Sequence, residues 1–402
     1  MSAARVPLGG GTRELAGLLA PWIARQDWAQ SALGVLGSRR VPVRTVDLEV
    51  LRPGRPGLAS VIVDAGQDPT SRLHVLVGWR DVAQATATLL RPGAVFGSGA
   101  DGEGSVLLYD ALADAELCLE LLGAVTGGRE RAARVRVVHS LASHASLVFD
   151  ERLFMKSYRV IERRTRPEIE VMEGLDRVGF NHLLAPVAHW SRAGGDLALV
   201  REFLPGAVEG KALALTSLRD LLARATGEGD GVPSFEEVGL AGGDLGDEMR
   251  RLGRTTAELH LALAEAFGVE SRSGSGPPLI RIHGDYHLRR VMRVEAGWLV
   301  AGFGDDPLTG RDAGAASQAD ARRAEAVADL AELCESLRLV AAEAVSVQTP
   351  ATLDLASAVA AGWVRHNTRA FLSGYLDTDG IARLAPGTAD DLLEKVASYR
   401  QR

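Results

Sequence analysis

The stretch from Arg281 to Pro307 constrains the fold of this 402-residue chain more than any other part of the sequence. It places a short polar motif, His-Gly-Asp-Tyr-His at residues 283–287, ahead of an apolar segment that ends at Phe303. Two aspartates and a proline at positions 305–307 close the stretch. This order predicts a loop, a strand and a second polar loop. Taken alone, the motif is also compatible with an ordinary turn, so its meaning depends on the features around it.

The composition indicates a globular, acidic protein. Hydrophobic residues make up 46% of the chain, which is ample for a buried core. The net charge of −7 and the lack of a long basic run argue against nucleic acid as a partner. The two cysteines, Cys118 and Cys334, lie in apolar helix-like segments, so we expect reduced, buried thiols and no disulfide.

The chain has neither a signal-peptide pattern at its N-terminus nor an apolar run of about 18 residues, the length of a membrane span. We therefore expect a soluble, cytoplasmic protein without a membrane partner. Its three lysines, Lys156, Lys211 and Lys395, contrast with abundant arginine, alanine and glycine, a bias typical of bacterial genomes of high GC content. Each lysine is more informative than usual, because arginine has taken the routine surface positions.

The N-terminal part of the chain predicts a small α+β module. Apolar residues at helical spacing predict a helix over Leu15–Trp28, with Trp28 packed in the core. Alternating apolar residues predict strands over Val41–Val50, Leu58–Val63 and Leu73–Val77. The glycine-rich residues 97–104 are expected to form a flexible loop before a helix over residues 111–122.

The pattern changes at Val135. From there to Tyr158 the sequence predicts three strands, with a polar loop over residues 140–146 between the first two. Lys156 lies in the third strand, and a helix is expected to begin at Pro167 with Glu170 in its first turn. Without a functional role, these two residues would be an exposed strand lysine and a glutamate favoured by the helix dipole.

The rest of the chain is mostly helical. An apolar strand that begins near Asp196 runs into a Pro-Gly turn at residues 205–206. Apolar periodicity then predicts a series of helices, one of which contains Asp329 and the others of which cover Leu218–Leu222, Leu245–Phe267, Leu353–Gly374 and Ala389–Tyr399.

Taken in order, these features resemble the maltokinases and glucosamine kinases, a group within the aminoglycoside phosphotransferase (protein-kinase-like) superfamily. The resemblance rests on Ile282–Leu288, on Gly-Arg-Thr-Thr-Ala-Glu-Leu-His at residues 253–260, and on the helix and sheet of the N-terminus. It implies an α+β, bilobal protein-kinase-like fold with an N-terminal maltokinase-type cap subdomain. The implied domains are a cap and intermediate subdomain at 1–130, an N-lobe with a hinge at 131–205, and a helical C-lobe at 206–402.

By this resemblance, Asp285 is the catalytic base that accepts the proton of the acceptor hydroxyl, with His283 as its catalytic neighbour. His287 and Asp329 would support the catalytic loop. His260, in the long helix before that loop, is expected to be a packing residue rather than a catalyst.

The resemblance also implies that ATP is bound by residues of the N-lobe and hinge, namely Lys156, Glu170, Glu202, Phe203, Ser143 and His144. Lys156 would contact the phosphates while Glu170 holds it in place. The backbone at Glu202 and Phe203 would hold the adenine. Ser143 and His144 would contact the phosphates, unless their loop is a plain hairpin turn.

Both metal-ligand positions of the family are substituted. The amide ligand five residues after the base is Arg290 here, and an arginine has only donors, so it cannot coordinate Mg²⁺. The carboxylate that follows the strand is replaced by Gly302, which leaves Asp305 or Asp306 to compensate and the use of Mg²⁺ open. Arg290 itself is expected to take part of the ion's place, because its guanidinium is a permanent cation suited to phosphate oxygens.

Three functions follow from the resemblance. The first is ATP-dependent phosphorylation of a sugar or amino-sugar hydroxyl, impaired by the substitutions at Arg290 and Gly302. The second is a catalytically inactive pseudokinase with a binding or regulatory role. The third is an aminoglycoside-type antibiotic phosphotransferase, which would need an acidic pocket that the sequence does not reveal. The sequence names no protein partner.

Overall fold

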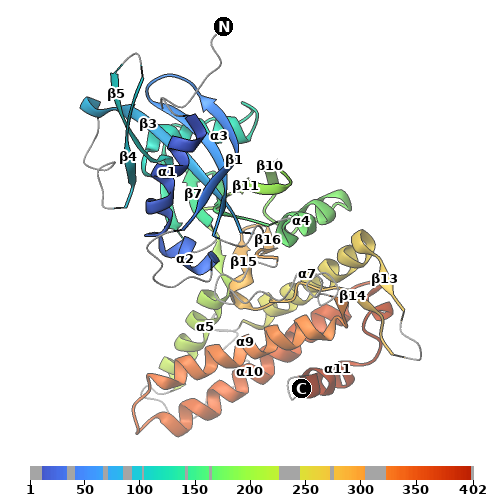
Figure 1. The fold of residues 1–402 in the computed structure, drawn as a ribbon. Helices are drawn as coiled ribbons and strands as arrows, with labels where there is room; N and C mark the ends of the chain where they lie inside the picture. The colour runs from blue at the N-terminus through green and yellow to red at the C-terminus, as the bar shows by residue number, and fades with distance from the viewer. Residues whose placement is uncertain are drawn as a thin grey trace. The chain divides into compact units, whose positions relative to one another are not determined.

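The computed structural model describes residues 11–33, 41–66, 71–84, 93–101, 104–140, 144–162, 165–225, 245–271, 276–303 and 323–399 (Figure 1). The chain divides into two compact units. The first contains Met1–Ile169 and Ala185–Pro205, and the second contains Glu170–Leu184 and Gly206–Arg402. The expected division into domains at 1–130, 131–205 and 206–402 stays a prediction.

The first sheet of the first unit has six strands. Its order is β1 (Val43–Arg52), β2 (Gly57–Ala65), β3 (Arg72–Asp81), β5 (Gly104–Asp110) and β4 (Val95–Asp101), with β9 (Val160–Ile161) paired to β3. Helices α1 (Gly11–Ile23) and α2 (Asp27–Leu33) pack on one face, as Figure 1 shows for α1. Because side chains alternate along a strand, Ala59, Val61 and Val63 of β2 face these helices, and Leu58 and Ile62 face the other side.

Two local expectations for this sheet are wrong. The single helix expected over Leu15–Trp28 is interrupted at residues 24–26, although Trp28 does pack in the core at 7% exposure. Residues 97–104 are not a flexible loop, since most of them belong to β4 and pair with β5. A Cβ at Gly97 would lie 2.8 Å from Leu18, so glycine there permits α1 to approach the strand.

The second sheet of the first unit has five strands. Its order is β10 (Pro186–Arg192), β11 (Gly195–Glu202), β8 (Leu153–Tyr158), β7 (His144–Phe149) and β6 (Val135–Ser140). The strands predicted after Val135 are confirmed. Leu153 and Met155 of β8 face the core that contains α3 (Ala115–Val125), so Phe154 and Lys156 lie on the opposite face of the sheet.

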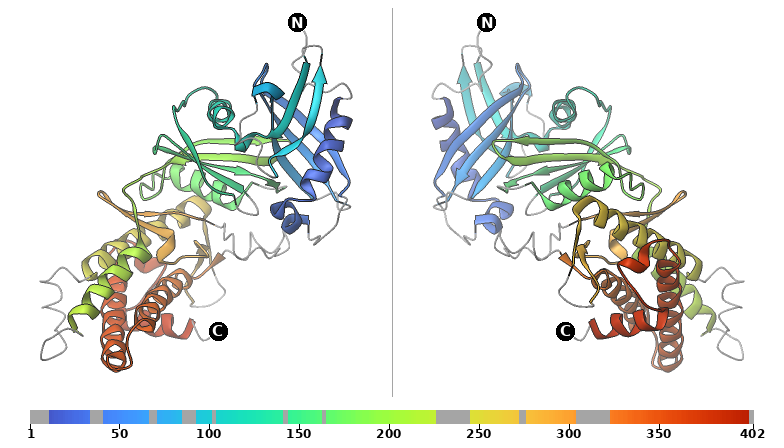
Figure 2. Two further views of the ribbon diagram at one scale, coloured as in Figure 1. Left: turned by 90° about the vertical axis from the view of Figure 1, so that its left-hand side faces the viewer. Right: turned by 90° about the vertical axis from the view of Figure 1, so that its right-hand side faces the viewer.

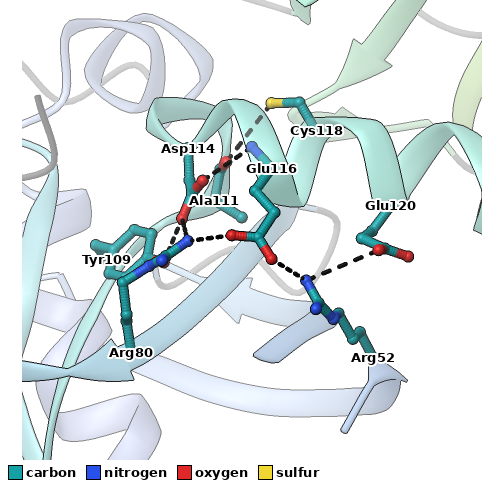
Figure 3. Close-up of polar contacts among 8 residues, drawn as sticks. All are labelled: Arg52, Arg80, Tyr109, Ala111, Asp114, Glu116, Cys118 and Glu120. Carbon is teal, nitrogen blue, oxygen red and sulfur yellow. Dashed lines mark hydrogen bonds and ion pairs between the residues drawn. The ribbon is translucent and has the colours of Figure 1, made fainter. Parts of the chain in front are cut away.

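A cluster of charged and hydroxyl groups fastens α3 to the neighbouring strands (Figure 3). The Asp114 side chain accepts a hydrogen bond from the Glu116 N–H, 3.0 Å away, and so caps the helix. The same carboxylate accepts from the Tyr109 hydroxyl at 2.7 Å and from Arg80 at 2.8 Å. Burial, and after it the hydrogen bond to Asp114, raises the pKa of the Tyr109 phenol. The cluster is accordingly a structural anchor, in which each polar group has a partner.

The second unit is mainly helical. Its helices are α5 (Gly210–Ala225), α7 (Gly246–Phe267), α9 (Val327–Ser346), α10 (Leu353–Leu376) and α11 (Ala389–Tyr399). Two small sheets accompany them, one with β12 (Val208–Glu209), β15 (Val291–Val294) and β16 (Gly297–Val300), the other with β13 (Val269–Glu270), β14 (Leu279–Arg281) and β17 (Arg323–Ala324). The unit boundary lies within α4 (Pro167–Arg177), which begins at the residue expected.

Glycines allow α7 and α10 to pack at close range, and both views of Figure 2 show the long helices of this unit side by side. A Cβ at Gly253 of α7 would lie 2.0 Å from the Phe371 carbonyl oxygen. One at Gly374 of α10 would lie 1.9 Å from the Arg250 carbonyl oxygen. The predicted motif at residues 253–260 therefore begins at a helix contact that excludes any larger residue.

Cys118 and Cys334 are both buried free thiols, as predicted. Within the ranges that the structure describes, no helix combines the length and the apolar character that crossing a membrane requires.

Candidate functional site

The loop between β14 and β15 carries the His-Gly-Asp motif, and a buried carboxylate holds its first residues. Asp329 of α9 accepts hydrogen bonds from the His283 N–H at 2.8 Å and from the Gly284 N–H at 3.0 Å. The Asp329 side chain is 0% exposed, and its third partner is the His260 Nε2 atom at 3.1 Å. Burial alone would raise the pKa of Asp329, but His260 and the other partners hold that pKa below its usual value. The residue is therefore an ionised, fully partnered support beneath the loop.

Two further side chains of α9 continue this support. The Tyr286 N–H donates to Glu332 Oε2 at 2.7 Å, and the Leu288 N–H donates to Ser336 Oγ at 3.2 Å. Residues 329, 332 and 336 lie on one face of a helix, because three or four residues make one turn. Our sequence interpretation missed Glu332 and Ser336. Polar residues at this spacing in an otherwise apolar helix were the signal that could have found them.

His260 and His283 both lie beneath the loop. His260 is 0% exposed, and its Nδ1 accepts from the Tyr375 hydroxyl at 2.9 Å, which makes it a packing residue. His283 is 2% exposed, and its Nε2–H donates to the Ala301 carbonyl at 3.1 Å. Burial lowers the pKa of His283 to about 4, so the ring is neutral. The ring positions the loop through the Ala301 carbonyl, and the expected role of His283 as the catalytic neighbour of Asp285 stays a prediction.

Asp285 projects from the loop, and basic side chains contact both of its carboxylate oxygens. Arg290 donates from Nε to Oδ2 at 2.8 Å and also from Nη2 to the same oxygen. His287 Nε2 lies 3.3 Å from Oδ1, while its Nδ1 accepts from the Arg289 N–H. Burial acts to raise the pKa of Asp285, but His287 and Arg290 outweigh it and lower this pKa to about 2. Asp285 is therefore ionised and already paired.

Gly302 lies against the same guanidinium. Its φ is +80°, and a Cβ built there would lie 2.8 Å from Arg290 Nη1 and 2.9 Å from Arg290 Cδ. The Arg290 side chain thus occupies the space into which a side chain at position 302 would project. Arg290 and Gly302 are therefore spatially linked, since a side chain at position 302 would have to displace the Arg290 side chain from its present position.

The described residues at this position do not fit a divalent ion. Arg290 fills the place of one expected ligand with a cation, and Gly302 offers no oxygen from a side chain. Within the described ranges, no group of three or more His, Cys, Asp or Glu residues could hold a metal. Asp305 and Asp306 lie outside the described residues.

In the first unit, Lys156 of β8 pairs with Glu168 and not with Glu170. The distance from Lys156 Nζ to Glu168 Oε2 is 2.5 Å, and Glu168 is 3% exposed. Glu170 instead pairs with Arg281 Nη2 at 3.1 Å. The predicted partner is wrong because residues two positions apart on a helix point about 200° apart, so only one of them faces the sheet.

The hinge and the loop before it differ from expectation in detail. The Glu202 N–H donates to the Ala185 carbonyl at 3.0 Å, and the Phe203 N–H donates to the Arg152 carbonyl at 2.8 Å. His144 is not a loop residue, because it begins β7 and pairs with Tyr158, with 5% of its surface exposed. Ser143 lies outside the described residues.

Comparison with known proteins agrees with this arrangement. Residues 22–114 match the maltokinase N-terminal cap domain. A glucosamine kinase of Streptacidiphilus jiangxiensis is 28% identical over 270 residues, which cover 57% of this chain and 57% of that protein. The aligned part therefore spans little more than half the length of this relative.

Solved glucosamine kinases share the fold over nearly the whole chain. One, in complex with glucosamine, ADP and inorganic phosphate, superposes with a TM-score of 0.56 at 20% identity and covers 95% of this chain and 94% of its own. Another glucosamine kinase structure, crystal form A, superposes with a TM-score of 0.55 at 18% identity and covers 97% of this chain and 95% of its own. The N-terminal part of the chain thus matches the maltokinase cap domain, and the chain is similar to glucosamine kinases in sequence and in fold. The predicted protein-kinase-like fold with a maltokinase-type cap is thereby confirmed.

Proposed function

We propose that this chain binds a nucleoside triphosphate and that its phosphoryl transfer to a sugar or amino-sugar hydroxyl is impaired. Nucleotide binding is supported by the Lys156–Glu168 pair, in which a nearly buried glutamate fixes the ammonium group on the face of the second sheet. It is supported as well by likeness to a glucosamine kinase solved with ADP. Glucosamine, bound in that same relative, is the first acceptor to test.

The observation that carries the impairment is the contact of Arg290 with Asp285. A general base works best when its pKa lies near the working pH, whereas the pKa of Asp285 is about 2. Two charge-assisted hydrogen bonds from Arg290 stabilise the ionised form of this carboxylate, so it is a weaker acceptor for the proton of an acceptor hydroxyl. A kinase also needs positive charge against the migrating phosphoryl group, and the described residues offer Arg290 in place of a divalent ion.

A binding or regulatory role without turnover is the second candidate, and the same ion pair favours it. The two candidates differ in whether any acceptor is phosphorylated. A coupled ADP-release assay with glucosamine, glucose and maltose separates them. We expect turnover far below the usual kinase range of about 1–100 s⁻¹. Turnover within that range would overturn the impairment.

Nucleotide binding needs its own measurement, since a protein without turnover gives no signal in that assay. A ligand that binds only the native state stabilises it by RT ln(1 + [L]/Kd) and so raises the melting temperature. We expect ATP to raise it, and Lys156→Met to abolish most of the rise. Lys395→Met is the matched control, because that lysine lies on α11, is partly exposed and, among the described residues, donates only to the nearby Pro386 carbonyl. An equal rise in both variants would contradict the assignment of Lys156.

A further inference from the structure

Arg201 at the end of β11 has hydrogen-bond donors for which the described part of the chain supplies no acceptor. Its Nη1 donates to the Glu202 carbonyl at 3.2 Å, and none of the described carboxylates lies within ion-pair distance. A guanidinium carries five N–H donors, so most of them remain available. Burial lowers the pKa of Arg201, and the charge of Glu168 acts only from longer range. A half-buried arginine of this kind is suited to an acceptor that the protein itself does not supply.

The neighbours of Arg201 hold its guanidinium in one place. Arg201 and Phe154 are directly opposite partners of β11 and β8, so their side chains share a face of the sheet. The Arg201 guanidinium carbon lies 4.4 Å from the Phe154 ring centroid. A planar guanidinium stacked on an aromatic ring loses little further freedom when it forms hydrogen bonds.

This residue shares its sheet face with the proposed phosphate lysine. Lys156 is two positions after Phe154 on β8, so the two side chains project to the same side about 6.6 Å apart along the strand. The opposite face carries Met155 and Val200 and is covered by the core around α3. Phosphates at Lys156 would thus place the rest of a nucleotide along the face that holds Phe154 and Arg201.

The backbone at the end of β11 is partly occupied. The N–H groups of Glu202 and Phe203 both donate to protein carbonyls, and the Glu202 carbonyl already accepts from Arg201. Adenine presents a 6-amino donor, which needs an acceptor from the protein. Guanine and hypoxanthine present a 6-oxo acceptor beside N7, the pair that an arginine fork recognises.

We propose that Arg201 makes the base end of the nucleotide site selective for a 6-oxopurine, so that guanosine and inosine triphosphates bind more tightly than ATP. The inference rests on the proposed nucleotide binding and adds its specificity. Arg201 would donate to O6 and N7 of the base, while Lys156 holds the phosphates. A bidentate contact of this type discriminates between bases by about tenfold or more.

The test compares the Kd of ATP, GTP and ITP for the full chain by calorimetry, with melting shifts as a second readout. We expect GTP and ITP to bind at least about tenfold more tightly than ATP. ITP separates the 6-oxo group from the 2-amino group, because it has only the former. Arg201→Gln should weaken GTP and ITP and leave ATP unchanged or tighter, since an amide can both accept and donate.

Arg44→Gln is the matched control, because Arg44 is 76% exposed, lies on β1 and loses the same charge. It should leave all three affinities unchanged. ATP binding as tight as GTP binding in the wild type would overturn the inference, as would equal losses in both variants. Absence of binding by any of the three nucleotides would instead refute the proposed nucleotide site. These outcomes separate failure of the specificity from failure of the function.

Discussion

The two ends of the loop between β14 and β15 are held by different kinds of contact. At residues 283–288, backbone N–H groups donate to Asp329, Glu332 and Ser336 of one helix. At residues 285–290, the contact is a charge pair between Asp285 and Arg290, packed against the bare Cα of Gly302. The first end supports the backbone of the loop, and the second end carries the residues for which we propose a role toward phosphate. The scaffold and the chemistry of this loop are therefore separable.

The largest loss of stability should come from removing the support of the loop at residues 283–288. Asp329→Ala leaves two backbone N–H groups and His260 without their buried partner, so we expect a loss of about 3–5 kcal/mol in the free energy of unfolding. Arg290→Ala should cost only about 1–2 kcal/mol, because its pair with Asp285 is partly exposed. Urea unfolding followed by circular dichroism measures both, with Asp354→Ala, at an exposed position in the first turn of α10, as the control. Equal losses at 329 and 290 would erase the distinction between the two ends.

At the second end, changes at Arg290 and Gly302 should have coupled effects on stability. Gly302→Asp alone places a side chain against Arg290 at a positive φ, and we expect a cost of about 1–3 kcal/mol. In the Arg290→Gln background the obstruction is removed, so the same change should cost at least about 0.5 kcal/mol less. Gly179→Asp is the control, since its φ of +76° is similar but a Cβ there would have no neighbour within 4 Å. A double-mutant cycle with no coupling energy would show that Arg290 and Gly302 are independent.

A smaller effect should appear in the pH dependence of stability, through Glu332, which supports the loop at residues 283–288. Burial, and after it the charges of Asp329 and Asp285, raises the pKa of Glu332 to about 7 from its ordinary value of 4.5. Because the folded-state pKa is raised, the stability contributed by protonation is fully present below about pH 4.5 and is lost as the pH rises through 7. The wild type should thus gain stability relative to Glu332→Gln as the pH falls from 7 to 4.5. We expect a gain of only about 1 kcal/mol, because the Glu332 side chain is buried on its loop side alone and the solvent on its other side screens the charge.

That comparison is made by measuring urea unfolding of both proteins at several pH values and subtracting one curve from the other. Burial lowers the pKa of His74, on β3, to about 4, as it does for His283, and the subtraction removes both contributions because they are common to the two proteins. A difference that does not change between pH 4.5 and 7 would show that Glu332 keeps an ordinary environment.

Sequence reasoning predicted the parts of this molecule that depend on long periodic patterns or on fixed motifs. The helices α7 and α10, the strands after Val135 and the loop with Asp285 lie where their patterns placed them. Local features that depend on tertiary contacts could not be predicted from the sequence. Whether Glu168 or Glu170 meets Lys156 is decided by the rotation of α4 toward the sheet, which no spacing specifies. In the same way, residues 97–104 form a strand only because β5 is available to pair with them.

The sequence shows that residue 290 is an arginine, but it does not show which groups this side chain contacts. The chemistry of arginine excluded metal coordination and suggested a contact with phosphate. The structure adds that the guanidinium is engaged by Asp285 and that Gly302 leaves room for it. Such a pairing depends on side-chain directions across a strand pair, because residue 290 ends a 3₁₀ turn and residue 302 follows β16.

The most direct test of this account is whether nucleotide binding depends on Mg²⁺. If Arg290 stands in place of the ion, the melting shift should be the same in nucleotide with EDTA as in nucleotide with Mg²⁺. A shift of this kind reports binding to the native state, amounting to about 2.7 kcal/mol at a hundredfold excess over Kd. The double variant Arg290→Gln with Gly302→Asp should acquire a dependence on Mg²⁺, since both changes restore oxygen ligands. A shift in the wild type that appears only with Mg²⁺ would contradict the claim that Arg290 replaces the ion.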